Sequence, residues 1–563
     1  MKFFRKKVTL IIVAAISLSS VIFMSLDRNT EFKIVKNLDI FYSLFRELNL
    51  FYVDDTDPEK LVESAIDGML SSLDPYTSYI PAKEKKNFKF QTTGEYGGIG
   101  SLIRKSDDYA IIAEPYKGFP ADKSQLIAGD KIFEIDGTPV KNKSLKEISE
   151  MLKGMPNTSL TVKVIRPYVN DTLTVSLKRE KITINSIPYY GMINDEIGYI
   201  LLRKFTEDVS KELEDALSDL KKNYGAKKII LDLRNNSGGL LIEAINVSNV
   251  FIPKGELVVS TKGKIDQFNN EYYTENQPVD TSIPLVVLVN SHSASASEIV
   301  AGCFQDYDRA VIVGTRTFGK GLVQTTRPLS YDSQLKVTTA KYYIPSGRCI
   351  QAIDYAHKNE DGSVSHIPDS LISAFKTDNG RTVYDGGGIK PDVVVEADQV
   401  SKMAYSLYSK NLLFDYATYF YHKHDSIKNP HHFELTDSQY DSFVKFLKDK
   451  EFDYQTQSES HLNKLIKKAK AEKYYEIAEE TFNELEKKLA HDKEKDLYTF
   501  KEGIIQLLEE EIVTRYYYQK GKIITQLEED PQLNKAIEIF HENKIYSSIL
   551  QGTYEKNDST VNN

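Results

Sequence analysis

Between Ile197 and Gln351, short apolar runs alternate with longer segments of helical periodicity, and this alternation limits the fold more than any other feature. The apolar runs predict strands at Gly198–Leu202, Lys228–Leu233, Leu285–Val289 and Ala310–Val313. The segments between them predict helices at Glu207–Lys222 and Leu240–Val250. Strands that alternate with helices in this way are typical of an α/β or α+β domain.

The chain is much longer than this one domain. Its 563 residues exceed what a single hydrophobic core organises, so two to four domains are expected. Glu31–Leu50 and the segment opened by Asp57-Pro58-Glu59 have helical patterns, whereas the Lys-rich stretch Pro81–Gln91 predicts a linker. After about Gln399 the chain is charged, Tyr-rich and poor in Gly and Pro, which predicts a helical bundle.

Composition excludes several classes of protein. The formal net charge of −9 argues against a nucleic-acid binder that works by net charge. Only two cysteines are present, Cys303 and Cys349, which excludes a disulfide framework and a Cys-rich zinc module. No spacing among the ten His residues is diagnostic of a metal site, so neither a metal nor a cofactor is expected.

The N-terminus has the pattern of a membrane anchor or a signal peptide. A basic segment, Met1–Lys7, precedes the uncharged run Val8–Leu26, which approaches the ~20 apolar residues that span a bilayer. The basic flank should stay in the cytoplasm, so everything after Asp27 is expected to be exported. Two interpretations stay open, an uncleaved anchor and a removed signal peptide, because no A-x-A cleavage pattern follows the run but several serines lower its hydrophobicity.

From Gly94 to about Arg179 the pattern changes to short strands. The turn Gly97-Gly98-Ile99-Gly100 precedes a strand at Ser101–Arg104, and a helix at Ser144–Leu152 precedes an alternating strand at Leu160–Ile165. In this order the segments resemble a PDZ domain in the permuted form found in bacterial proteases. The resemblance implies that the turn binds the C-terminal carboxylate of a peptide, which then pairs with the adjacent strand edge. The alternative is a small β domain with glycine turns.

Three further segments can carry chemistry, and the first contains Ser295. The apolar strand that ends at Val289 runs through the serines at 291, 293, 295 and 297 into a helix that continues through Ile299. A serine at such a turn is exposed near a helix N-terminus, which favours a developing negative charge. Alternatively, Ser295 only caps the helix, and Glu298 completes a capping box.

The second segment places Lys320 between two glycines, in Phe318-Gly319-Lys320-Gly321. A lysine that is desolvated in an apolar site has a lowered pKa and can act as a general base, and Gln324 can hold its amine by a hydrogen bond. The alternative is a solvated surface lysine.

In the third segment, the strand Ile229–Leu233 enters a turn that contains Gly238 and Gly239. The backbone N–H groups of such a turn can form half of an oxyanion hole, or the turn can be a simple connection.

Together these segments resemble the C-terminal processing peptidases, or tail-specific proteases, a family of Ser–Lys endopeptidases. The resemblance covers most of Glu31 to about Val395. The motifs that carry it are Tyr52-Val53-Asp54, Ser72–Tyr79, the PDZ segments, Leu231–Gly239, Ser293–Ile299, Phe318–Gln324, Thr339–Tyr343 and Gly388–Asp392.

The resemblance implies roles for the residues that match these motifs. Ser295 would be the nucleophile, Lys320 its general base and Gln324 the residue that orients the lysine. The oxyanion hole would be formed by the N–H of Ala296 and that of Gly238 or Gly239. The family often has Gly where His292 stands and Pro where Ser237 stands, but neither position replaces a proposed catalytic group. A Ser–His pair with His292 is disfavoured, because three residues before the nucleophile is poor geometry for a base.

The expected architecture is a multidomain α+β protein with a permuted PDZ domain ahead of an α/β protease core. The expected parts are an anchor or signal peptide at 1–26, an N-terminal helical region at 27–90, the PDZ domain at 91–182, the Ser–Lys peptidase core at 183–398, a helical C-terminal domain at 399–550 and a disordered tail at 551–563.

The expected function is an exported serine endopeptidase that processes or degrades proteins from their C-terminal ends. Its expected location is the bacterial inner membrane, with the catalytic part on the periplasmic side. Its partners would be protein substrates with exposed C-termini and, through the N-terminal helices, further copies of itself. The alternative function is a non-catalytic PDZ scaffold of the cell envelope, which the presence of Ser295, Lys320 and Gln324 disfavours.

Overall fold

A computed structural model describes residues 30–169, 171–359, 363–396, 400–489 and 492–554. The chain divides into two compact units, Met1–Tyr79 with Thr326–Val337, and Ile80–Thr325 with Thr338–Asn563. In the first unit a helix covers residues 30–51 and α2 covers Pro58–Ser71. Asp57 caps α2 by accepting hydrogen bonds from the N–H groups of Glu59 and Lys60, as the Asp-Pro-Glu signal predicts.

The expected membrane segment, residues 8–26, lies outside the described residues. Of the expected disordered tail, 551–563, residues 555–563 also lie outside them, whereas residues 551–554 are described, and the N–H of Thr553 donates to Ser548 O at 2.9 Å. No helix within the described ranges combines the length and the apolar character that crossing a bilayer requires.

The second unit begins with the short strand β1 (Ser78–Ile80) at its boundary, followed by the turn η1 (Ala82–Glu84) and helix α3 (Lys85–Thr93). The prediction of a linker at Pro81–Gln91 is therefore wrong. Gly94 ends α3 in the left-handed conformation, and its N–H donates to Phe90 O. The Phe90 ring packs edge-on against Tyr96 at 5.2 Å, so packing and a glycine cap outweigh the polar composition of this segment.

The expected PDZ domain follows as a sheet with the strand order β3-β4-β5-β7-β8, in which β6 pairs with β5. Its strands are β2 (Glu95–Gly98), β3 (Ser101–Ser106), β4 (Tyr109–Pro115), β5 (Lys131–Ile135), β6 (Thr138–Pro139), β7 (Ser159–Arg166), β8 (Asp171–Lys178) and β9 (Glu180–Thr183). Its helices are α4 (Pro120–Lys123) and α5 (Leu145–Leu152). Ser144 caps α5 in a capping box with Glu147, close to the predicted helix boundary.

The core domain is built on a six-stranded sheet with the order β10-β11-β12-β15-β16-β23. All neighbours are parallel except β10 with β11. The strands are β10 (Tyr189–Met192), β11 (Ile197–Leu201), β12 (Lys228–Asp232), β15 (Leu285–Val289), β16 (Val311–Gly314) and β23 (Val393–Val394). The four strands predicted from the apolar runs are the four central strands of this sheet.

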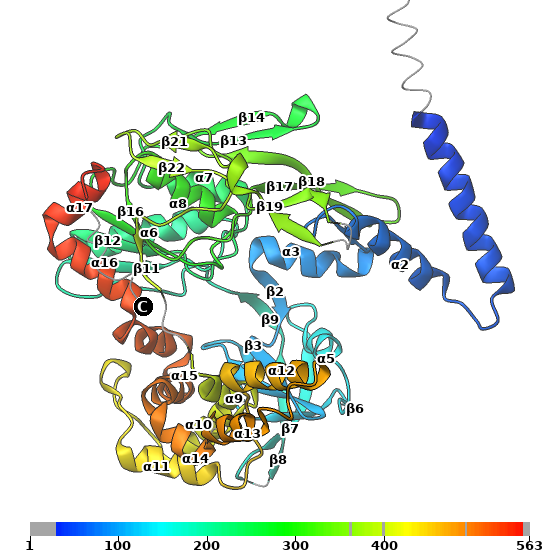
Figure 1. Cartoon of the computed structure of the whole chain (residues 1–563), viewed down its shortest axis with the longest axis vertical. Coiled ribbons are helices and arrows are strands. Elements are labelled where there is room, and N and C mark those ends of the chain that lie inside the picture. Colours follow the sequence, from blue (N-terminus) through cyan, green and yellow to red (C-terminus); the bar gives the residue numbers. More distant parts are fainter. Residues whose placement is uncertain (1–29, 170, 360–362, 397–399, 490–491, 555–563) are drawn as a thin grey trace, which may run out of the picture. The chain divides into compact units, whose positions relative to one another are not determined.

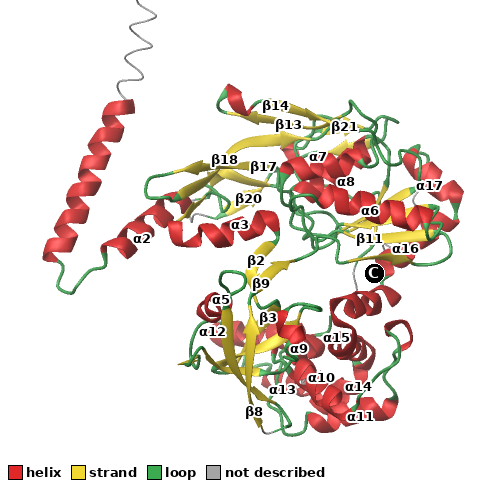
Figure 2. Ribbon diagram, turned by 180° about the vertical axis from the view of Figure 1, so that it is seen from behind, coloured by secondary structure: helices red, strands yellow, loops and turns green. Residues whose placement is uncertain are grey.

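Helices cover both faces of the six-stranded sheet (Figures 1 and 2). One face packs on α6 (Val209–Lys222), α7 (Leu241–Asn249) and α8 (Ala296–Asp306). The other face packs on the end of α15 (Lys501–Glu528), on α16 (Pro531–His541) and on α17 (Asn543–Leu550). The last helices of the chain thus form one layer of the core domain.

A second sheet and two hairpins complete the core domain. In that sheet β14 pairs with β13, β13 with β18, and β18 with β17. Their bounds are β13 (Leu257–Gly263), β14 (Asn270–Tyr273), β17 (Leu322–Pro328) and β18 (Gln334–Tyr343). The hairpins are β19 (Ile353–Lys358) with β20 (Val364–His366), and β21 (Ala374–Lys376) with β22 (Thr382–Tyr384).

The rest of the C-terminal segment is helical, and all of its helices except α12 and α13 form an apolar core with the first half of α15. Its helices are α9 (Lys402–Ser409), α10 (Leu412–Lys423), α11 (Asp437–Phe446), α12 (Gln457–Ala471), α13 (Glu479–Leu489) and α14 (Lys493–Thr499). Phe414 of α10 packs on Ile111, Ala113 and Ala128 of the PDZ domain. Helix α15 is interrupted at Tyr518, where φ is 56° and ψ is −161°. One half of α15 therefore belongs to the helical core and the other half covers the sheet.

Candidate active site

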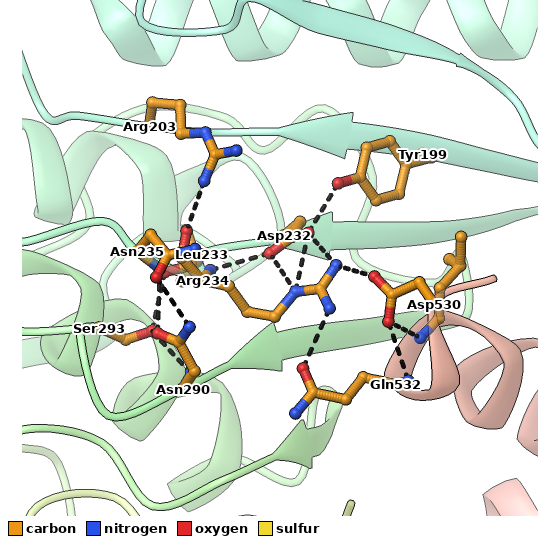
Figure 3. Close-up of polar contacts among 11 residues, drawn as sticks. Tyr199, Arg203, Asp232, Leu233, Arg234, Asn235, Asn290, Ser293, Asp530 and Gln532 are labelled. Carbon is orange, nitrogen blue, oxygen red and sulfur yellow. Dashed lines mark hydrogen bonds and ion pairs between the residues drawn. The ribbon is translucent and has the colours of Figure 1, made fainter. Parts of the chain in front are cut away.

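Parallel pairing of β12 with β15 brings two of the predicted segments to the same edge of the sheet. β12 leads into residues 235–239, here called the glycine turn, and β15 leads into the loop that carries Ser295. Asn235 and Asn290 join the two by exchanging two hydrogen bonds, each 3.0 Å long (Figure 3). The sheet topology thus explains why segments far apart in sequence form one site.

Ser295 stands immediately before α8 with a half-buried side chain. Its backbone has φ 57° and ψ −115°, whereas an N-cap residue is normally extended. A non-glycine residue in this region is strained, and strained strand-to-helix turns are used elsewhere to expose a nucleophilic serine. The backbone of Ser295 therefore differs from that of an ordinary helix cap.

Gly238 lies directly against the backbone of Ser295. Its φ is +97°, and a methyl group on its Cα would come within 2.9 Å of both Ser295 Cβ and Ala296 N. Only glycine fits this position, because any side chain would collide with the first peptide of α8. This close contact places the glycine turn beside the backbone N–H of Ala296, the residue that follows Ser295.

The two glycines differ in their backbone partners. The N–H of Gly238 donates to Asn236 Oδ1 at 2.9 Å. Gly239 instead packs against the backbone of Phe205, whose carbonyl oxygen would lie only 2.2 Å from an added Cβ. Both positions require glycine, for different steric reasons.

Lys320 follows β16 in the neighbouring loop, and its side chain is half-buried. The N–H of Phe318 donates to Ser293 O at 3.0 Å, which pairs this loop with the segment before the nucleophile. Since β15 and β16 are parallel neighbours, the Ser295 and Lys320 loops leave the same edge of the sheet.

The carboxylate of Glu298 connects these two loops. Glu298 Oε2 accepts hydrogen bonds from the backbone N–H of Ser295 at 2.8 Å and of Lys320 at 2.9 Å. Glu298 Oε1 accepts from the Thr317 hydroxyl at 2.6 Å and from the N–H of Gly319 at 2.7 Å. Burial raises the pKa of Glu298 to about 7, although these four donors act in the opposite direction. The sequence predicted only the capping contact.

Tyr342 is a second connection, which the sequence analysis did not single out. Its buried hydroxyl group donates to Lys320 O at 2.5 Å and to Ser295 O at 3.2 Å. The ring lies in the core of the domain. A tyrosine at an apolar position of a strand could have indicated this contact in the sequence, since a buried tyrosine hydroxyl normally forms a hydrogen bond.

The sequence predicts a role for Gln324 beside Lys320 and disfavours His292 as a base. Gln324 Nε2 donates to Leu322 O and to Thr338 Oγ1, each at 3.2 Å, so its contact with Lys320 stays a prediction. The side chain of His292 is exposed, and its Nδ1 lies 3.5 Å from Ser291 Oγ.

The four residues of the predicted carboxylate turn in the PDZ domain do not form a single turn. Gly97 and Gly98 belong to β2, which pairs with Lys181 and Glu180 of β9. Ile99 is buried in the PDZ core, and Gly100 turns the chain into β3 with φ +71°. In the order of the PDZ sheet β3 is an end strand.

Four known families match successive parts of the sequence. Residues 24–84 match the N-terminal domain of the activating protease CtpB, and residues 111–166 match a PDZ domain. Residues 196–357 match peptidase family S41, and residues 403–540 match the C-terminal helical domain of a probable PDZ-protease.

Curated relatives match long stretches of the chain. A carboxy-terminal-processing protease of Bartonella bacilliformis is 38% identical over 347 residues, which cover 61% of this chain and 79% of that protein. The chain belongs to peptidase family S41. A probable CtpA-like serine protease of Staphylococcus aureus (strain COL) is also 38% identical, over 352 residues that cover 61% of this chain and 68% of that protein. The solved structure of the photosystem II D1 C-terminal processing protease is 28% identical, covers 63% of this chain and 92% of that chain, and gives a TM-score of 0.34.

This S41 protein is therefore a serine-type C-terminal processing peptidase with a PDZ domain, and its substrates are proteins. The non-catalytic scaffold considered as an alternative is not retained. The multidomain α+β architecture, with helical regions on either side of the PDZ domain and the core, is confirmed.

Proposed function

We propose that Ser295 is the nucleophile of this peptidase and Lys320 its general base. The observation that carries the proposal is that Glu298 and Tyr342 each contact the backbone of both residues. The two shared partners hold the backbones of the two loops at a fixed separation, and a proton transfer between their side chains requires such a framework. Gln324 is the residue that orients the lysine.

In the proposed reaction the neutral amine of Lys320 takes the proton of Ser295 Oγ as that oxygen attacks the scissile carbonyl carbon. The oxyanion that forms accepts hydrogen bonds from the N–H of Ala296 and from that of Gly238 or Gly239. The C–N bond then breaks, the protonated Lys320 gives its proton to the leaving amine, and the acyl group stays on Ser295. Water hydrolyses this ester, with Lys320 again as the base.

We also propose that the PDZ domain recognises the C-terminus of the substrate. The end strand β3 leaves one edge for pairing with an extended peptide, and the turn at Ile99 and Gly100 lies at its beginning. Binding at this edge would select proteins by their C-terminal ends, in keeping with a C-terminal processing peptidase.

For its location, we propose an exported enzyme anchored in the bacterial inner membrane with its catalytic part on the periplasmic side. The support is the basic segment Met1–Lys7 followed by the uncharged run Val8–Leu26. Membrane fractionation tests this: the full chain should stay with the membrane after a carbonate wash, and a chain that lacks residues 1–26 should not. Recovery of the full chain in the soluble fraction would contradict the proposal.

We propose further that copies of the chain associate through the helix at residues 30–51. This helix exposes a large set of apolar side chains, namely Phe32, Ile34, Val35, Leu38, Ile40, Phe41, Tyr42, Leu44, Leu48, Leu50 and Phe51. An apolar surface of this extent marks an interaction site, and a second copy of the helix has the matching character. Sedimentation of the wild type should show an oligomer that Leu38→Glu with Leu44→Glu dissociates, and an unchanged mass would contradict the proposal.

The catalytic assignment is tested by cleavage of an unfolded protein with the wild type, Ser295→Ala, Lys320→Ala and Lys320→Arg. Only the wild type should cut, because an arginine at 320 cannot lose its proton to act as a base. Each variant must keep the circular dichroism spectrum of the wild type. Cleavage by folded Ser295→Ala or Lys320→Ala would overturn the assignment.

A further inference from the structure

Arg234 lies between β12 and the glycine turn, and its side chain contacts the last helical layer of the chain (Figure 3). Its Nη2 lies 2.6 Å from Asp232 Oδ2 and 2.6 Å from Asp530 Oδ2. Its Nη1 donates to Gln532 Oε1 at 3.0 Å. The guanidinium is thus shared between a carboxylate of its own strand and two side chains at the start of α16.

The two partners on α16 are themselves held firmly. Asp530 is the N-cap of that helix, and its Oδ1 accepts from the N–H groups of Gln532 and Leu533 at 2.9 and 3.1 Å. Gln532 Nε2 donates to Val395 O at 2.7 Å. The side chain of Asp530 is 11% exposed, and Gln532 is 2% exposed. Neither side chain is a freely moving surface group, so the contact has a defined geometry.

Asp232 completes the cluster from the side of the sheet. It accepts a hydrogen bond from the Tyr199 hydroxyl at 2.6 Å. Burial opposes its charge, but Arg234 holds the pKa of Asp232 below its ordinary value. The aspartate therefore stays ionised, and the arginine faces two carboxylates inside a mostly buried cluster.

The residues that follow Arg234 bind the segment of the nucleophile. Asn235 and Asn290 exchange two hydrogen bonds. The carbonyl oxygen of Asn236 accepts from the N–H of Ala294 at 3.0 Å and from Ser297 Oγ at 2.8 Å. A displacement of the backbone at 234 therefore reaches both the glycine turn and the residues on either side of Ser295.

We infer that Asp530 and Gln532 are positioning residues, through which the C-terminal helical layer holds the glycine turn in its working geometry by fixing Arg234. This inference rests on the proposed roles of Ser295 and the glycine turn. Its physical reason is that an oxyanion donor acts only within a few tenths of an ångström of its working place, and a buried charge that loses one partner moves to find another. The helical layer is then a part of the active enzyme and not only a covering of the sheet.

The same layer offers a matched control at the opposite end of the sheet. The hydroxyl of Tyr546, on α17, accepts a hydrogen bond from the N–H of Leu285 at 3.0 Å, where β15 begins. Removal of this hydroxyl weakens the contact between the same helical layer and the sheet, but at the end of β15 opposite the active site. A loss of packing alone would therefore affect Tyr546→Phe and an Asp530 variant alike.

The test compares full-length wild type, Asp530→Asn, Tyr546→Phe and Ser295→Ala in cleavage of an unfolded protein substrate. Asn keeps the N-cap of α16 and removes only the charge that faces Arg234. For Asp530→Asn we expect kcat to fall by about tenfold, less than the loss of a whole oxyanion donor, with KM within about twofold of the wild type. Tyr546→Phe should keep the kcat of the wild type, and thermal melting should show both variants folded at the assay temperature.

An unchanged kcat in Asp530→Asn would overturn the inference, and so would an equal fall of kcat in Tyr546→Phe. A higher KM with unchanged kcat would overturn it too, because that pattern places the effect on substrate binding. The proposed function fails separately, if folded Ser295→Ala cleaves the substrate.

Discussion

Ser295 and Lys320 share two partners, one at their backbone N–H groups and the other at their carbonyl oxygens. Glu298 Oε2 accepts a hydrogen bond from the N–H of each residue, and the Tyr342 hydroxyl donates to the carbonyl oxygen of each. Both partners are buried in the core domain. The distance between the two catalytic loops is therefore set by side chains that do not themselves take part in bond breaking.

Tyr342→Phe should lower kcat while leaving KM nearly unchanged. The change removes one hydroxyl group, keeps the buried ring, and leaves the two carbonyl oxygens without that donor. The free energy of unfolding should fall by about 1–2 kcal/mol, the usual cost of one buried hydrogen bond. Cleavage kinetics and urea unfolding measure the two effects.

Tyr307→Phe is the matched control for this prediction. The Tyr307 hydroxyl also donates to a backbone carbonyl, that of Leu257 at 2.8 Å, and Leu257 begins β13, outside both catalytic loops. Tyr307→Phe should lower the free energy of unfolding by a similar amount and leave kcat unchanged. If both variants lost kcat equally, Tyr342 would have only a structural role.

Local sequence patterns predict the elements that depend on neighbouring residues. The strand Leu285–Val289 has the predicted bounds, because an unbroken apolar run between polar turns leaves few alternatives. The sequence predicted Glu298 as a capping residue, since its contact with the N–H of Ser295 joins residues only three positions apart. Its bonds to the Lys320 loop, and the ion pair of Arg234 with Asp530, join residues far apart in sequence, which no local pattern encodes.

Glu298→Gln should reduce kcat by at least about tenfold. A carboxylate accepts all four donors of this site, whereas the amide of glutamine turns an NH₂ group toward two of them. In either orientation of the amide a backbone N–H of the Lys320 loop is repelled, that of Lys320 itself or that of Gly319 beside it. Steady-state cleavage, at a temperature where the variant is folded, measures the effect.

Glu243→Gln provides the comparison for a buried glutamate of the same domain. Glu243 lies on α7 and accepts a hydrogen bond from the N–H of Ser210 at 3.0 Å, away from both catalytic loops. Its substitution should destabilise the protein and spare kcat. A normal kcat in Glu298→Gln would show that the shared carboxylate is dispensable.

The stability of the wild type relative to Glu298→Gln should fall as the pH rises. Burial raises the pKa of Glu298 from 4.5 to about 7, so the folded protein holds this proton more tightly than the unfolded chain does. The contribution is fully present below about pH 4.5 and is lost as the pH rises through about 7, a difference on the order of 3 kcal/mol. Urea unfolding of both proteins at several pH values between 5 and 8 measures it, and parallel curves would contradict a perturbed Glu298.

Amidation of the substrate C-terminus should raise KM with little effect on kcat. The amide removes the charge that backbone N–H groups at the start of β3 are proposed to bind, while the scissile bond and the Ser295 site stay the same. A loss of about tenfold in kcat/KM is expected for one charge-assisted hydrogen-bond site. Binding of the same two peptides to Ser295→Ala, followed by fluorescence anisotropy, separates recognition from turnover. Equal affinities for the free and the amidated peptide would remove the PDZ turn from substrate recognition and leave only the strand edge.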